Sequence, residues 1–265
     1  MKIKTGELKF RARRSLWGNY GTLTIIQLAI TVCAGIFIGA LYLFMILFVV
    51  AGAVIGSGVP LPALFTAGTA GIAIFLYLAY LLLASIIGAG YARIMLDMCL
   101  GMRAEPGRIF FAFRNHFLKF TGITLLMAGA GILGSLPSLL WSFSLRLQIM
   151  YGALGQILTV FQWCFLLWFG LTYGLAYYIL LEDTEKGVFQ CMRESRELMR
   201  GNRIRRLLMG ISFAGWYVLI WVTLGIGSLW VLPYISCTSA HFYLDLRERR
   251  RLEEWGYQAE KAGMQ

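Results

Sequence analysis

Long stretches without any charged residue dominate the chain and alternate with short basic segments. No Lys, Arg, Asp or Glu occurs between Arg14 and Arg93, and further charge-free runs cover 120–145, 147–181 and 207–244. Each run contains at least one stretch of roughly 20 predominantly apolar residues, the length that an α-helix needs to cross a bilayer. The pattern predicts an all-α polytopic membrane bundle.

The first two spans fall in the longest run, and the next two flank Arg146. Residues 51–69 contain several glycines and prolines, which are typical of a loop. This loop separates predicted spans at 22–50 and 71–92. The following pair is predicted at 121–141 and 156–181.

The last apolar run is too long for one span. Its 38 residues would form a helix of about 57 Å, nearly twice the hydrocarbon thickness. Gly225, Gly227 and Pro233 interrupt it, and glycine suits a tight turn because it adopts unusual backbone angles. A turn at 225–228 gives spans at 207–224 and 229–245, with Pro233 near the start of the second, where a missing N–H costs least. One kinked helix is the alternative, which would leave five spans.

The charges favour six spans in three hairpins. With six, every Lys and Arg except Arg146 falls in segments 1–20, 93–120, 182–206 and 246–265, all on one side. Every Asp and Glu lies in the same segments or, for Asp245, at the inner end of the last span. The positive-inside rule makes that side cytoplasmic, so both termini are predicted there. With five spans, the basic tail after Arg247 would lie on the other side and weaken the asymmetry.

The composition agrees with a membrane location and limits the kinds of partner that the chain is expected to bind. The chain is 59% hydrophobic and only 14% charged, whereas about 25% charged is typical of soluble domains. Its net charge of +11 would place a basic face against anionic lipid headgroups. Nucleic-acid binding is the competing interpretation, but no nucleic-acid-binding fold is recognisable, so we expect none.

The sequence predicts no metal, cofactor or catalytic site. Its five cysteines and two histidines are scattered, with no C-x-x-C pair, which argues against a zinc site or a disulfide framework. Nucleophile-elbow, phosphate-loop and zinc-protease motifs do not occur. We therefore expect a protein that is not an enzyme.

Two cytoplasmic segments show helical periodicity. In 105–120, four phenylalanines recur at helical spacing opposite polar residues, which predicts an interfacial amphipathic helix: Phe110, Phe113, Phe117 and Phe120. The alternative is that this segment simply begins the third span. In 183–202, a second helix would dock under the bundle through one face: Val188, Cys191, Met192, Ser195, Leu198 and Met199.

A polar stripe marks the last predicted span. Thr238, His241 and Asp245 recur at i, i+3 and i+7 on one face. A functional interpretation makes them a binding or proton-sensing strip, since histidine titrates near physiological pH. The structural alternative is that Thr238 bonds within the bundle while the other two reach the inner headgroups.

Several segments resemble a bacterial membrane-protein family catalogued as domain of unknown function 975. The matching segments are RARRSLWGNY at 11–20, GAGYARIMLDMCLG at 88–101, YYILLEDTEKGVFQCMRESRELMRGN at 177–202, and the hairpin from Ser212 to Leu246. Two departures occur: the family's Pro-Gly in the fourth span appears as Phe169-Gly170, and its Asn-Pro after Asp183 appears as Thr184-Glu185. These departures weaken the expectation of a kink in that span and of a tight turn after Asp183.

The resemblance implies a multi-pass bacterial plasma-membrane protein with no assigned activity and no catalytic residues. With the basic face, this favours a scaffold or accessory subunit of an envelope process, contacting anionic lipid and a membrane-protein partner. The alternative is a facilitator or transporter of a small molecule or lipid, using a path near Thr238 and His241. A membrane-embedded enzyme ranks third.

Overall fold

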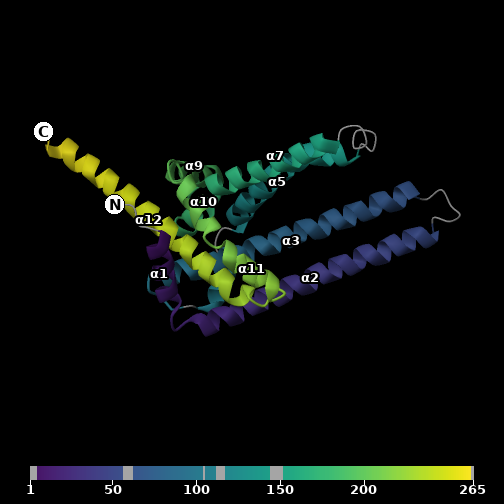
Figure 1. The fold of residues 1–265 in the computed structure, drawn as a ribbon, viewed down its shortest axis with the longest axis horizontal. Helices are drawn as coiled ribbons and strands as arrows, with labels where there is room; N and C mark the ends of the chain where they lie inside the picture. Colours follow the sequence, from purple (N-terminus) through teal and green to yellow (C-terminus); the bar gives the residue numbers. More distant parts are fainter. Residues whose placement is uncertain (1–4, 56–61, 104, 112–116, 144–151, 264–265) are drawn as a thin grey trace.

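Two long helical hairpins give the molecule its shape. The computed structural model describes residues 5–55, 62–103, 105–111, 117–143 and 152–263, and in these ranges every regular element is helical. The hairpins extend in the same direction in Figure 1 and are formed by α2 (Tyr20–Ile55) with α3 (Pro62–Cys99) and by α5 (Phe117–Phe143) with α7 (Gly152–Tyr173). We call these two hairpins the arms. The prediction of an all-α fold is confirmed.

The remaining helices gather where the arms begin. They are α1 (Thr5–Leu16), the 3-10 helix η1 (Pro106–Phe110), α8 (Ala176–Glu182), α9 (Val188–Leu198), α10 (Arg203–Ile211), α11 (Ala214–Val222) and the longer α12 (Ser228–Gly263). We call this region, with the adjoining turns of α2, α3 and α5, the packed end. In Figure 1, α1 lies beside α12, whose C-terminal half projects away from the other helices.

The packed end contains the buried core. On α1, the side chains of Leu8, Ala12 and Leu16 recur at every fourth position and are at most 1% exposed. Cys237 and Phe242 on α12 are fully buried, and the core continues into the last turns of α3 and into α8. Helical periodicity therefore places one face of α1, α8, α9, α10 and α12 in a common interior, whereas α11 and η1 have no buried residue.

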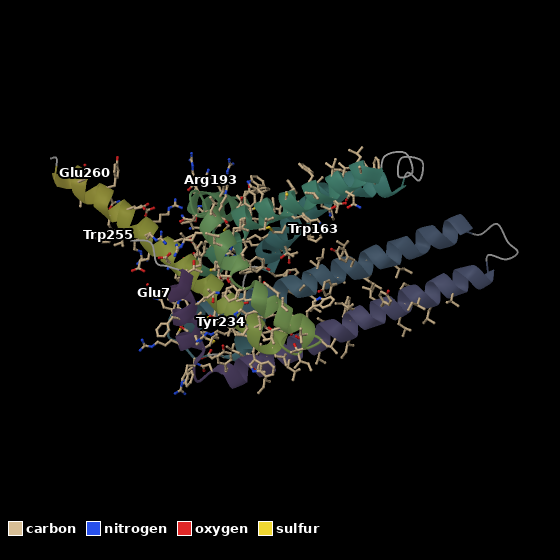
Figure 2. The ribbon with its side chains drawn as sticks, in the orientation of Figure 1. Glu7, Trp163, Arg193, Tyr234, Trp255 and Glu260 are labelled. Atoms are coloured by element: carbon tan, nitrogen blue, oxygen red, sulfur yellow. The ribbon has the colours of Figure 1, made fainter. Side chains whose placement is uncertain are left out.

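The arms instead expose apolar side chains. Tyr42 and Phe75 are each 70% exposed, and Trp163 on α7, labelled in Figure 2, is 67% exposed. Five helical segments among the described residues are long and apolar enough to cross a membrane: Tyr20–Phe44, Phe75–Cys99, Phe117–Ser138, Ala153–Glu182 and Arg203–Val222. Exposed apolar surface of this extent marks an interaction site and suits lipid contact, so the chain has the character of a membrane protein.

The predicted loop at 51–69 is mostly helical, so the helices extend beyond the predicted spans at 22–50 and 71–92. α2 continues to Ile55, and α3 begins at Pro62, while residues 56–61 lie outside the described ranges. Proline suits this first helical position because its missing N–H would have no partner there. Glycine and proline content therefore marked the loop but overestimated its length.

The fourth predicted span, 156–181, is interrupted. α7 ends at Tyr173 and α8 begins at Ala176, and a Cβ atom on Gly174 would lie 2.5 Å from the carbonyl oxygen of Gly170. Glycine is thus required at the break although Phe169 replaces the family's proline. A turn also follows Asp183, whose Oδ1 accepts a hydrogen bond from the Glu185 amide at 3.1 Å. Both features occur despite the two sequence departures.

The last apolar run turns where the sequence predicted. α11 ends at Val222 and α12 begins at Ser228, with φ of +92° at Gly225. A Cβ atom on Gly227 would lie 2.7 Å from Thr223 Oγ1, and Pro233 lies inside α12. The predicted sixth span, 229–245, is not among the five apolar candidates. This segment carries Ser, Thr and His residues, and in the packed end these are surrounded by protein rather than by lipid.

The two predicted cytoplasmic helices have different outcomes. In 105–120, η1 is followed by residues 112–116, which include Phe113 and lie outside the described ranges, and α5 begins at Phe117. Phe110 is 61% exposed, whereas Phe120 is fully buried in the core. The prediction of a single interfacial stripe is therefore wrong, because core packing takes Phe120. The predicted docking face of α9 is confirmed, since Cys191, Ser195 and Met199 are fully buried.

Candidate functional site

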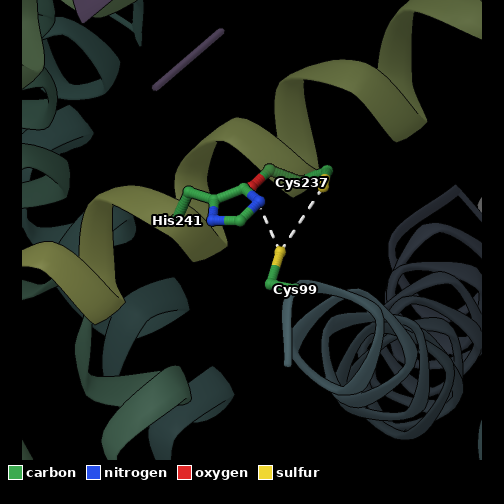
Figure 3. Close-up of side chains that lie close together, drawn as sticks. All are labelled: Cys99, Cys237 and His241. Atoms are coloured by element: carbon green, nitrogen blue, oxygen red, sulfur yellow. Dashed lines mark hydrogen bonds between the residues drawn. The ribbon is translucent and has the colours of Figure 1, made fainter. Parts of the chain in front are cut away.

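Two thiols and one imidazole meet in the packed end. Cys237 and His241 lie one turn apart on α12, and Cys99 is the last residue of α3. The two sulfur atoms are 3.4 Å apart, and the three potential ligand atoms all lie within 4.8 Å of one another. Figure 3 shows Cys99 facing both side chains of α12. We call these three residues the thiol–imidazole cluster.

α1 holds the imidazole from a third direction. Ser15 Oγ lies 3.0 Å from His241 Nε2, so the hydroxyl and the ring share a hydrogen bond. This hydrogen bond involves Nε2, and the other ring nitrogen, Nδ1, takes no part in it. The residues of α1 that precede Ser15 pack on α12 through the buried face containing Leu8 and Ala12, which fixes the serine relative to the histidine.

The cluster borders a cavity of about 340 Å³. Cys99 and His241 form part of its wall, together with apolar side chains and the charged residues Arg11, Asp245, Arg247, Glu248 and Arg251. Cys237 is fully buried behind them. The cluster is therefore reachable from this cavity, although it lies against the core. Cysteine sulfur and imidazole nitrogen are the ligand types that soft metal ions prefer.

The three residues of the polar stripe predicted on α12 have different partners. Thr238 is fully buried and donates a hydrogen bond to the carbonyl oxygen of Tyr234 at 2.8 Å, as the structural alternative expected. His241 bonds to Ser15 instead. Asp245 is 5% exposed and forms ion pairs with Arg205, at 2.6 Å, and with Arg249. Protein partners thus replace the headgroup contacts expected for the last two residues.

A second buried carboxylate joins α3 to η1. Asp97 is 1% exposed and is shared by Arg93, at 3.1 Å, and Arg108, at 2.5 Å. Hydrogen bonds from Arg108 to Glu105 and to Asp97 raise the pKa of its guanidinium, which stays charged. This group was not among the residues predicted from the sequence. The spacing Arg93-x-x-x-Asp97 was an available signal, because such residues are neighbours on a helix.

Arg93 and a third acid tie α8 into the same region. The guanidinium of Arg93 donates a hydrogen bond to the carbonyl oxygen of Leu181 at 2.7 Å. Glu182 pairs with Arg247 and accepts a hydrogen bond from the Tyr243 hydroxyl at 2.6 Å. The charged residues named here therefore connect helices from distant parts of the sequence.

Sequence reasoning also missed the thiol–imidazole cluster. Cys99 and Cys237 are 138 residues apart, and no C-x-x-C spacing joins them. The available signal was the Cys237-x-x-x-His241 spacing, which places a thiol and an imidazole on one helical face. Only the packing of α3 on α12 supplies the third side chain.

Comparison with known proteins gives a family without an assigned activity. The family model described as "Protein of unknown function (DUF975)" matches residues 1–250. No curated protein and no solved structure matches the chain. The match covers the described residues of the arms and almost all of the packed end.

Proposed function

Since the chain belongs to the DUF975 family, whose function is unknown, we propose its role from its architecture. It is a six-span protein of the bacterial plasma membrane with both ends in the cytoplasm, and it acts as a non-enzymatic scaffold or accessory subunit of an envelope process. The observation that carries this proposal is the separation between the charge-free arms and the packed end, where the ion pairs lie.

The distribution of charge supports the orientation. Apart from Arg146, which lies outside the described residues, no charged residue occurs in either arm beyond the turns that join the packed end. α1 and the C-terminal half of α12 both lie at the packed end. Both basic segments lie on the side opposite the direction in which the arms extend. That side fits the cytoplasm under the positive-inside rule, while α11 and the first half of α12 would enter the membrane from it.

Cysteine labelling in intact cells tests this topology. In a chain whose five native cysteines are replaced, Ile226→Cys in the turn between α11 and α12 should react with a membrane-impermeant thiol reagent. Ile226 is 63% exposed and lies between Trp221 and Trp230, aromatic residues of the type enriched at membrane interfaces. Gln258→Cys, in the exposed half of α12, should react only after permeabilisation. Reaction of both positions from outside would exclude six spans.

Polar contacts between the arms favour the scaffold over the facilitator. The hydroxyl of Tyr177 donates to the carbonyl oxygen of Ser85 at 2.8 Å and lies 3.2 Å from Thr124 Oγ1. Ser85 is only 2% exposed. These polar groups between α3, α5 and α8 therefore satisfy one another, whereas a path for a polar solute would leave such groups facing water.

Thiol accessibility at the same positions separates the two functions. In the cysteine-free chain, Ser85→Cys and Thr124→Cys should be protected from water-soluble thiol reagents in native membranes and become reactive on unfolding. Rapid labelling of both in the folded protein would reveal a water-filled path and favour the facilitator. Gln258→Cys provides the reactive control in permeabilised cells.

A groove between α5, α7 and α9 supports an anionic lipid as partner. It has a volume of about 470 Å³, is lined mainly by apolar side chains such as Leu125, Leu133 and Phe169, and ends at Arg193 and Arg196. An apolar channel that ends at two exposed guanidinium groups suits an acyl chain with an anionic headgroup. In nanodiscs, anionic lipid should raise the melting temperature, and Arg193→Gln with Arg196→Gln should remove most of this gain. The Arg200→Gln variant, two residues after the end of α9 and outside the groove, is the control.

A further inference from the structure

We infer that Cys99, Cys237 and His241 bind a thiophilic d10 metal ion, Zn²⁺ or Cu⁺. This site goes beyond the scaffold function and does not depend on it. The inference rests on three donor atoms from two helices, within 4.8 Å of one another, beside a cavity. Thiolate and imidazole ligands select this class of ion over hard cations such as Mg²⁺ and Ca²⁺.

The distances suit one shared ion. With metal–sulfur bonds of about 2.3 Å and tetrahedral angles, two cysteine sulfurs lie about 3.8 Å apart. The observed separation is 3.4 Å, so the two side chains need to open by only about 0.4 Å. Small rotations of the side chains supply this change without any movement of α3 against α12.

Ser15 can fix the tautomer of the histidine. Its hydroxyl engages Nε2 at 3.0 Å, and ligation through Nδ1 would leave this hydrogen bond intact. Metal-binding histidines usually donate their other ring N–H to an oxygen, which fixes the tautomer and the ring plane. Ser15 supplies this oxygen from α1, and α3 and α12 supply the ligands. The ion would therefore join three helices.

The cavity gives access and an open coordination position. Cys99 and His241 line it, so an ion can enter without unfolding the core, and water can occupy the fourth position. Arg11 and Arg247 on its wall also pair with Glu7 and Glu182. The two thiol protons leave to solvent as the ion binds.

The other described cysteines do not share this environment. Cys33 and Cys164 are exposed on the arms, and Cys191 is buried in α9. A buried cysteine alone is readily explained as a small apolar side chain. Two thiols in contact, with a histidine held toward them by a hydroxyl, need a further explanation, and a shared metal ion provides it.

Metal titration of the full-length protein in detergent tests the site. The protein is stripped with a chelator, kept reduced with a phosphine, and titrated with Zn²⁺ and, under anaerobic conditions, with Cu⁺ in competition with chromophoric chelators. One ion should bind per chain. Co²⁺ should give the sulfur-to-cobalt charge-transfer absorption of a thiolate site. The relative affinity for Zn²⁺ and Cu⁺ identifies the ion within the proposed class.

Variants assign the ligands. Cys99→Ser, Cys237→Ser and His241→Gln should each lower the affinity by at least about 100-fold, while Ser15→Ala should lower it about 10- to 100-fold. Cys191→Ser and Cys164→Ser are matched controls that should bind as the unchanged chain does. Melting curves without metal show which variants remain folded, and the isosteric serine variants are chosen for that reason.

Three results would overturn the inference. They are the absence of one-to-one binding by the unchanged chain, binding that survives Cys99→Ser and Cys237→Ser together, and a Cys99–Cys237 disulfide that persists in the reductant. Each can be observed without knowledge of the physiological function. Loss of the scaffold function in cells, with metal binding intact, would count against the proposed function only.

Discussion

Phe120 in the packed end is completely buried, whereas Phe75 on the α2–α3 arm is 70% exposed, although both belong to long apolar helices. The same contrast separates most of the packed end from the arms. Hydropathy measures how much apolar surface a helix carries, but lipid and protein can both cover that surface. α12 illustrates the difference: its first half is less apolar than α2, yet it supplies Cys237, Ala240 and Phe242 to the core.

The largest effect should separate these two phenylalanines. Phe120→Ala should lower the free energy of unfolding by about 3–5 kcal/mol, because it removes a fully buried ring and leaves a cavity. Phe75→Ala should change it by less than about 0.5 kcal/mol in detergent, since the ring packs on little protein. Reversible denaturation of both variants measures the difference. Equal losses would mean that the arms pack as tightly as the core.

The buried carboxylate offers the next test. Asp97→Ala should cost about 1.5–3 kcal/mol, because the buried carboxylate loses its charged hydrogen bonds to Arg93 and Arg108, whose side chains are 25% and 34% exposed. Glu105→Gln is the control: Glu105 also contacts Arg108, but its side chain is 64% exposed, so its loss should cost at most about 1 kcal/mol. Thermal melting in one detergent compares the two variants. Similar melting temperatures would place Asp97 in contact with water.

Much of this division could be predicted from the sequence, and the exceptions have physical causes. Charge-free runs identified the arms, and Gly225 with Gly227 located the last turn, because such signals depend on neighbouring residues. The long helical continuations into 51–69 were missed because glycine is tolerated inside a helix at modest cost. Phe120 and Asp245 were assigned to the interface and the headgroups, because the sequence does not show which helices cover them.

The thiol–imidazole cluster marks a sharper limit. Cys237 and His241 share a helical face that the sequence reveals, but Cys99 reaches them only when α3 packs on α12. Side chains 138 residues apart carry no local spacing signal. The polar stripe indicated His241, but the neighbours predicted for this residue were wrong, because the pattern uses the spacing along one helix alone.

Two glycines on α3 give a smaller effect within one helix. A Cβ atom on Gly90 would overlap the backbone of Ile109 in η1, whereas one on Gly88 would meet nothing within 4 Å. Gly90→Ala should therefore cost about 1–3 kcal/mol through overpacking. Gly88→Ala should be neutral or stabilise the protein by up to about 1 kcal/mol, since alanine favours the helix. Melting of the pair measures this. A harmless Gly90→Ala would mean that η1 does not pack closely on α3.

The smallest expected effect concerns Cys191, the buried thiol of α9. Burial and the neighbouring Glu194 carboxylate raise its pKa from 9.0 to about 11. The folded chain therefore keeps this proton between about pH 9 and pH 11, where the unfolded chain loses it. The stabilisation is complete below about pH 9 and disappears as the pH rises through about 11, so that stability falls across this window.

The comparison variant is Cys191→Ala. Between pH 8 and pH 10, the free energy of unfolding of the unchanged chain should fall by about 1 kcal/mol more than that of Cys191→Ala. Denaturation of the reduced proteins at several pH values measures the difference, and the comparison removes other groups that titrate in both chains. Parallel pH profiles would show that water reaches the thiol in the folded protein, and that the packed end is less closed at α9 than the complete burial of Cys191 indicates.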